Sequence, residues 1–145
     1  MITKYLVDTN VLSRLTQSQR ASMFFSQHCL LTTDVLHEAS GFPDLVKLKS
    51  LEVPVDGEIL QTLSEVMRSL DPNDKDLVDL YAYEGTADPL LIAAALAAER
   101  RSVNQLWSDK WIVVTEDQAV QTTGAAHAVP TMGFSDFIEL LAPSQ

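Results

Sequence analysis

The hexapeptide Tyr5-Leu6-Val7-Asp8-Thr9-Asn10 decides the fold. Its first three residues predict a short buried strand, because aromatic and β-branched side chains suit a pleated, half-buried surface. The strand runs directly into Asp8 and Asn10, and a helical pattern begins at Val11. Asp8 is therefore either the polar residue that ends the strand and serves the amides of the next helix, or one wall of a reaction site.

Similar short apolar segments predict strands at residues 4–7, 29–31, 111–114 and 129–132. None of them alternates strictly between apolar and polar residues, which is typical of parallel strands buried on both faces. Helical patterns occupy the intervals, at residues 11–15, 19–27, 34–40, 44–51, 57–70, 75–83, 89–103, 117–126 and 135–141. Strands alternating with helices predict an α/β domain with a mostly parallel sheet, in which one long, wholly helical crossover spans residues 56–103.

Chain length and composition predict one domain over residues 1–145, long enough to form a core without disulfides or a structural metal. The richest apolar stretch covers ten residues, 89–98, which is about half of what a membrane span needs and fits a central core helix instead. No secretory signal is visible at the N-terminus. A lone cysteine, Cys29, is expected to be a small buried core residue and fits a reducing cytoplasm.

The formal net charge is −10, from 20 acidic and 10 basic residues. This balance argues against broad non-specific nucleic-acid binding, which depends on a basic surface that displaces counterions. It leaves room for a nucleic-acid enzyme, because acidic residues gathered in one site are neutralised by bound cations. It also leaves room for a basic protein partner.

Four acidic residues, Asp8, Glu38, Asp88 and Asp117, follow predicted strands or begin predicted helices. In open parallel sheets, ligands bind outside the carboxyl ends of the strands, so these four side chains are expected at one edge. Gathered carboxylates repel one another unless a cation or shared protons compensate. Mg²⁺ takes oxygen ligands, and metal ions activate water and neutralise charge in phosphoryl displacement. The pattern therefore favours a metal-dependent phosphodiesterase.

Each acidic residue also has a purely structural interpretation. Asp88 precedes Pro89 and suits a helix N-cap. The run Thr115-Glu116-Asp117-Gln118 fits a capping box with Thr115 as the cap. Glu38 can be a solvated helix residue, and Asp8 or Asn10 can serve the helix amides in a strand-to-helix turn. Only the joint arrangement of the four favours a site.

Neighbouring polar residues complete the candidate site. Thr9, Asn10 and Thr115 can hold carboxylates or metal-bound waters in place. Arg14 lies four residues after Asn10, on the same predicted helix face, where it can contact a phosphate. The three histidines are expected to be ordinary surface or helix-end residues, and the aromatic residues near the C-terminal half are expected to pack in the core.

Four segments in order resemble the motifs of PIN domains: LVDTNVL at 6–12, VLHE at 35–38, DPLLIAAA at 88–95 and VVTED at 113–117. The resemblance covers essentially the whole chain, although residues 42–69 match nothing in it and Pro89 stands where alanine is commoner. It implies a three-layer α/β/α sandwich around a mostly parallel sheet of four to five short strands. Asp8, Glu38, Asp88 and Asp117 would be the catalytic and metal-binding quartet, with Asn10 and Thr115 beside it.

The resemblance further implies a cytoplasmic ribonuclease that uses Mg²⁺ or Mn²⁺ and leaves a 5′-phosphate and a 3′-hydroxyl. Many bacterial members of this size are VapC-type toxins of toxin–antitoxin pairs, so we expect an RNA substrate, a small antitoxin partner and a homodimer. The alternative is a catalytically silent PIN-like domain that binds RNA or protein. A receiver-like signalling domain is disfavoured, because Thr9 replaces the second acid that such domains carry and no lysine follows residues 112–115.

Overall fold

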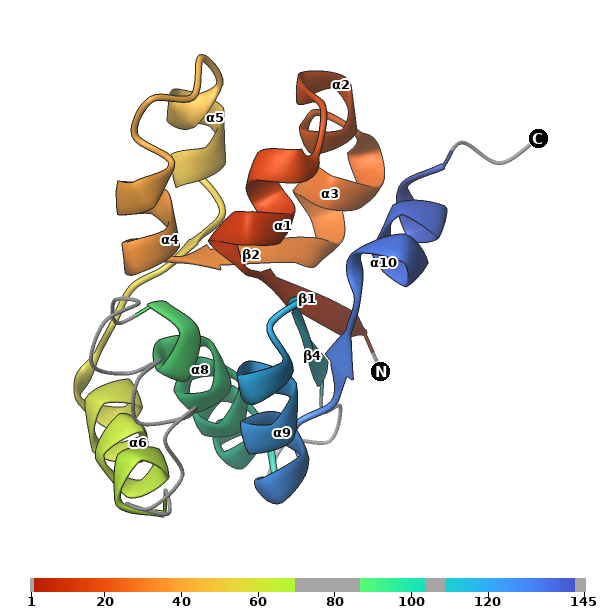
Figure 1. Cartoon of the computed structure of the whole chain (residues 1–145). Coiled ribbons are helices and arrows are strands. Elements are labelled where there is room, and N and C mark those ends of the chain that lie inside the picture. Colours follow the sequence, from red (N-terminus) through yellow and green to blue (C-terminus); the bar gives the residue numbers. More distant parts are fainter. Residues whose placement is uncertain (1, 70–86, 104–108, 143–145) are drawn as a thin grey trace.

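The computed structural model describes residues 2–69, 87–103 and 109–142, and it describes residues 87–89 through their backbone alone. Within these ranges, five parallel strands form one sheet in the order β3-β2-β1-β4-β5 (Figure 1). The strands are β1 (Thr3–Val7), β2 (Cys29–Thr32), β3 (Glu52–Val53), β4 (Lys110–Val114) and β5 (Thr131–Met132). The helices are α1 (Thr9–Arg14), α2 (Gln17–Arg20), α3 (Met23–His28), α4 (Thr33–Glu38), α5 (Leu45–Lys49), α6 (Gly57–Arg68), α8 (Ala87–Ser102), α9 (Gln118–Ala126) and α10 (Phe134–Leu141).

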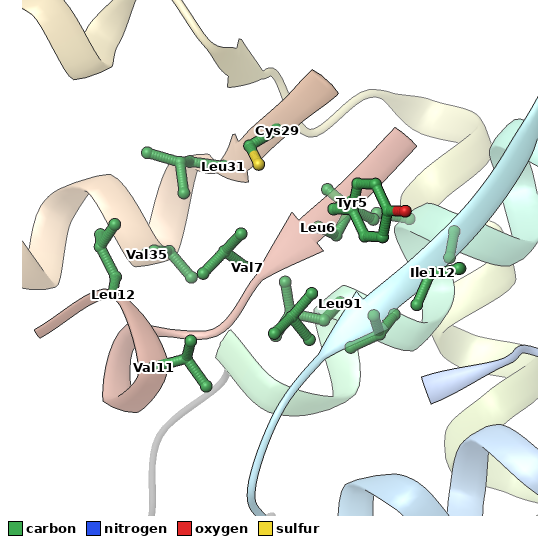
Figure 2. Packing of buried hydrophobic residues seen from close by; sticks show 14 of the residues in the cluster. Tyr5, Leu6, Val7, Val11, Leu12, Cys29, Leu31, Val35, Leu91 and Ile112 are labelled. Carbon is green, nitrogen blue, oxygen red and sulfur yellow. The ribbon is translucent and has the colours of Figure 1, made fainter. Parts of the chain in front are cut away.

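Helices cover both faces of the sheet, which confirms the predicted α/β/α sandwich (Figure 1). The Tyr5 ring of β1 packs against Phe24 of α3 and Phe137 of α10, so these helices cover one face. On the other face, α8 packs against β1, β2 and β4, and α6 and α9 pack against α8. Buried apolar side chains from β1, β2, β4, α1, α4 and α8 fill the core between the layers (Figure 2).

The predicted strands at 4–7, 29–31 and 111–114 are confirmed, and each is one residue longer than expected. The strand predicted at 129–132 shrinks to Thr131–Met132. Pro130 has no N–H to donate to a ladder, and the Val129 N–H donates to the Gly124 carbonyl oxygen at 2.8 Å instead of to the sheet. The two-residue strand β3 was not predicted, because two residues are too short to show a periodicity.

The helix predicted at 19–27 is wrong, because two helices stand in its place. Thr16 and Gln19 form a capping box at the start of α2, and the Ser22 hydroxyl accepts from the Phe25 N–H to begin α3. Two N-caps six residues apart leave no room for one continuous helix. The other predicted helices are confirmed with shifts at their ends, except that residues 75–83 lie outside the described ranges.

Cys29 is buried, as expected, and burial raises the pKa of its thiol. No helix in the described ranges is both long enough and apolar enough to cross a membrane.

Candidate functional site

The strand order reverses between β1 and β4, and this reversal places Asp8 and Thr115 side by side. The chain first adds β2 and β3 on one side of β1, then crosses over to add β4 and β5 on the other side. Val7 pairs with Val114, so the next residues along the two strands, Asp8 and Thr115, continue the same register. In open α/β sheets this switch point, at the carboxyl ends of the strands, is where ligands bind.

The Asp8 carboxylate is buried and held by Thr115. The Thr115 hydroxyl donates to Asp8 Oδ2 at 2.8 Å, and the Asp8 N–H donates to the Val114 carbonyl oxygen at 3.0 Å. Asp8 is 4% exposed and Thr115 is fully buried. Among the described residues, nothing donates to the other carboxylate oxygen, Oδ1. Within those residues, the Asp8 side chain is thus held through Oδ2 alone.

Thr115 also connects Asp8 to Asp117. The Asp117 N–H donates to the Thr115 hydroxyl oxygen at 3.1 Å, and Asp117 Oδ1 accepts from the Ala119 N–H at 2.9 Å. The prediction that Thr115 caps this helix is therefore wrong: Asp117 is the N-cap of α9. Asp117 is better placed to cap because it directly precedes the first helical residue, which leaves the Thr115 hydroxyl free to bond Asp8.

The backbone brings Asp88 to the same edge. Tyr5 faces α3 and α10, so by alternation along β1 the Asp8 side chain faces the α8 layer. Helix α8 precedes the parallel strand β4 and therefore begins near the carboxyl edge of the sheet. It begins at Ala87, which puts Asp88 in its first turn and not at the predicted N-cap.

The described side chains of the predicted quartet are not all gathered. Glu38 ends α4 with an exposed side chain that forms no hydrogen bond or ion pair in the described part of the chain. Within the same part, no three His, Cys, Asp or Glu side chains form a group that could hold a metal ion. The Asp88 side chain lies outside the description. The structure thus links Asp8 with Asp117, and the quartet as a metal site stays a prediction.

The secondary polar residues differ in their surroundings. Thr9 Oγ1 is buried and has no hydrogen-bond partner within the described ranges, whereas Asn10 is exposed on α1. Arg14 is about half exposed: its Nη1 lies 3.4 Å from Glu116 Oε1, and its guanidinium carbon lies 4.0 Å from the centre of the Phe134 ring. These contacts hold the Arg14 charge beside the loop that follows β4. The histidines lie at helix ends, as expected: His28 ends α3, His37 is in the last turn of α4 and His127 is the C-cap of α9.

Thr32 is a polar residue of this edge that the sequence did not single out. It ends β2 and is 1% exposed, and its hydroxyl also has no hydrogen-bond partner among the described residues. The sequence signal was weak, because a threonine between a strand and a helix ordinarily serves as a helix cap.

An oxygen-rich edge of this kind suits a hard divalent cation. Mg²⁺ keeps several waters and commonly uses only one or two carboxylates directly, and hydroxyl groups can hold those waters. Asp8 Oδ1 and the two partnerless threonine hydroxyls are donors of this type. The residues present therefore fit such an ion.

Comparison with known proteins gives no independent assignment. No family model matches the chain, and no curated protein matches it.

Proposed function

We propose that this chain is a divalent-metal-dependent endoribonuclease of the PIN type that hydrolyses RNA phosphodiester bonds. The observation that carries the proposal is the buried Asp8 carboxylate, fixed by the Thr115 hydroxyl at the switch point of the sheet. Burying a carboxylate is costly unless hydrogen bonds or a cation compensate, and the described residues supply one side-chain donor, the Thr115 hydroxyl.

Each residue has a part in the proposed reaction. Asp8 and Asp117 hold Mg²⁺ or Mn²⁺ directly or through water, and Glu38 and Asp88 complete the site or orient the attacking water. Thr115 fixes the orientation of Asp8, and Arg14 contacts a phosphate of the RNA after leaving Glu116. When bound, such an ion would supply a water of lowered pKa and would neutralise charge on the phosphate.

Cleavage of RNA by wild-type protein and by Asp8→Asn, with and without chelator, tests the proposal. We expect cleavage with Mg²⁺ or Mn²⁺ that leaves 5′-phosphate ends, and loss of at least about 100-fold with chelator or in the variant. Glu139→Gln is the matched control, because it makes the same carboxylate-to-amide change at an exposed site on α10. Cleavage that is absent in the wild type, or indifferent to chelator and to Asp8→Asn, contradicts the nuclease.

A toxin role within a toxin–antitoxin pair, with a small antitoxin partner and a homodimer in the cytoplasm, belongs to the same proposal. We expect overexpression of the wild type, but not of Asp8→Asn, to arrest growth, and co-expression of a short neighbouring reading frame to relieve the arrest. Harmless overexpression together with no such neighbour counts against the toxin role and leaves the nuclease standing.

One observation favours a second candidate, a silent PIN-like domain that binds RNA or protein without cutting. Glu38 is exposed, and in the described part of the chain it does not form a group with Asp8 and Asp117 that could hold a metal ion. For this candidate we expect RNA or partner binding that survives Asp8→Asn, with no cleavage by either protein.

A further inference from the structure

A row of side chains runs across the carboxyl ends of three neighbouring strands. Leu6 pairs with Leu30 and with Val113, so two residues further along each strand the row reads Thr32, Asp8, Thr115. The backbone at Asp8 and at Thr32 is still extended, so the alternation of side chains continues to these positions. Asp8 therefore lies between two threonines on one face of the sheet, the face that α8 covers.

The two threonines that flank Asp8 use their hydroxyl groups differently. The Thr115 hydroxyl donates to Asp8 Oδ2 at 2.8 Å. The Thr32 hydroxyl has no hydrogen-bond partner in the part of the chain that the structure describes, although its oxygen is buried. Thr32 is also the N-cap of α4, yet its side chain accepts no amide of that helix. The Thr32 side chain therefore does not cap the helix, although a threonine at an N-cap position ordinarily does so.

A buried hydroxyl without a partner is costly, and native proteins satisfy such groups with protein atoms or with ordered water. Thr9 adds a second partnerless buried hydroxyl directly after Asp8. Asp8 Oδ1 is likewise uncommitted among the described residues. Within the described ranges, these two buried hydroxyls and Asp8 Oδ1 have no hydrogen-bond partner, and a bound water or the hydration shell of a cation would supply one.

We infer that Thr32 is a positioning residue that holds a metal-bound water against Asp8 Oδ1, on the side of Asp8 away from Thr115. The inference rests on the proposed function, since the water belongs to the divalent ion that the function requires. Groups that hold the ligands of a metal in place typically change its affinity by about 10- to 100-fold when they are removed.

Three variants test the role. Thr32→Val keeps the shape of the side chain and removes only the hydroxyl, and Thr32→Ser keeps the hydroxyl. Thr62→Val on α6 is the matched control: Thr62 is also buried, but its hydroxyl donates to the Glu58 carbonyl oxygen at 2.8 Å. The readouts are the midpoint of thermal unfolding in chelator and the dissociation constant of Mn²⁺ from calorimetry, without RNA.

We expect Thr32→Val to unfold in chelator at the wild-type temperature or higher, because it loses no hydrogen bond, and to bind Mn²⁺ about tenfold more weakly. Thr32→Ser should restore the wild-type affinity. Thr62→Val should unfold at a lower temperature and bind Mn²⁺ as the wild type does.

Two results overturn the inference, and they are distinguishable. If the wild type binds Mn²⁺ and Thr32→Val binds it equally well, Thr32 has no positioning role and the proposed function is untouched. If the wild type binds no Mn²⁺ and cleaves no RNA, the proposed function fails and the inference fails with it.

Discussion

Thr115 is the residue on which the site geometry depends. Its hydroxyl donates to the Asp8 carboxylate and accepts the Asp117 N–H, so one small group fixes two of the four predicted acids. The bond to Asp8 is a consequence of register, because Asp8 and Thr115 follow the last paired residues of β1 and β4, whereas the bond from the Asp117 N–H is local.

Thr115→Val should therefore destabilise the fold by about 1–3 kcal/mol, because it leaves a buried carboxylate oxygen without its donor. Thr115→Ser retains the hydroxyl and should cost less than half as much. Urea unfolding measures both free energies. Equal stability of Thr115→Val and the wild type would show that the bond to Asp8 contributes nothing.

Arg20 and Asp44 form the other buried polar contact at the residue scale. Arg20 Nε and Nη2 donate to the two Asp44 oxygens at 2.9 and 3.0 Å, and Nη1 donates to the Leu15 carbonyl oxygen at 2.7 Å. Their side chains are 8% and 10% exposed. The hydrogen bonds from Arg20 hold the pKa of Asp44 below its ordinary value of 3.8.

Asp44→Asn should cost about 3 kcal/mol near neutral pH, because it leaves a buried guanidinium unpaired. The Asp44 pKa is lower in the folded than in the unfolded chain, so its stabilising effect is complete above the unfolded value and is lost as pH falls through the folded value. Unfolding free energies of wild type and variant should thus differ at pH 7 and converge below about pH 4. A pH-independent difference would contradict this.

At the scale of elements, packing and not charge joins α6 to α8. Buried Ile59, Thr62 and Val66 form the inner face of α6. Arg100 and Arg101 of α8 reach acidic residues on and before α6, but these side chains are about half exposed. Exposed ion pairs contribute little, about 0–1 kcal/mol each.

Ile59→Ala should lower the free energy of unfolding by about 2–4 kcal/mol, whereas Arg101→Ala should lower it by less than about 1 kcal/mol. Leu60→Ala is the matched control, because Leu60 is adjacent but 55% exposed. Denaturant titration compares the three variants. A larger loss of unfolding free energy for Arg101→Ala than for Ile59→Ala would mean that charge, and not packing, joins the two helices.

At Gly124 in α9, close contacts with the following chain outweigh the low helix propensity of glycine. A Cβ there would lie 2.9 Å from both the Val129 carbonyl oxygen and Thr131 Cγ2, since the chain turns tightly from α9 toward β5. Alanine elsewhere in a helix gains about 1 kcal/mol over glycine.

Gly124→Ala should instead destabilise by about 1–3 kcal/mol, because the neighbouring backbone must move. Gly57→Ala, at the first residue of α6 with open space around it, should be neutral or stabilising. Thermal or urea unfolding of the Gly124→Ala and Gly57→Ala variants tests this difference. If both changes stabilise the protein, the backbone between α9 and β5 moves at little cost in free energy.

The elements that local chemistry specifies were predictable, and those that depend on contacts were not. Short apolar runs specified β1, β2 and β4, and their ends placed Asp8 and Asp117 at one edge. Strand β3 exists because Leu31 and Thr32 pair with Glu52 and Val53, which no local pattern encodes.

The same limit applies to the whole molecule. The sequence shows that acidic residues follow predicted strands. It does not show the register that aligns Thr32, Asp8 and Thr115 in one row. It also gave Thr115 as a helix cap, because a capping-box pattern is local, whereas its bond to Asp8 spans 107 residues. Long-range pairing thus decided which hydroxyls belong to the site.

Net charge governs the stability of the whole molecule in salt. At −10, the folded chain carries a general self-repulsion that unfolding relieves, and salt screens it. Salt also screens the favourable surface ion pairs, such as those of Lys4 and Arg100, which opposes the first effect. These pairs are worth little singly, so the repulsion should dominate.

We therefore expect the midpoint of thermal unfolding to rise between low and about 0.3 M NaCl, where the screening length falls well below the size of the domain. Chelator in all samples keeps divalent cations out of the measurement. Glu139→Gln, with one negative charge fewer at an exposed site, should unfold slightly higher in low salt and respond slightly less to NaCl. A midpoint that falls as NaCl is added would mean that the ion pairs outweigh the repulsion, and the balance of charges at the surface would then stabilise this fold.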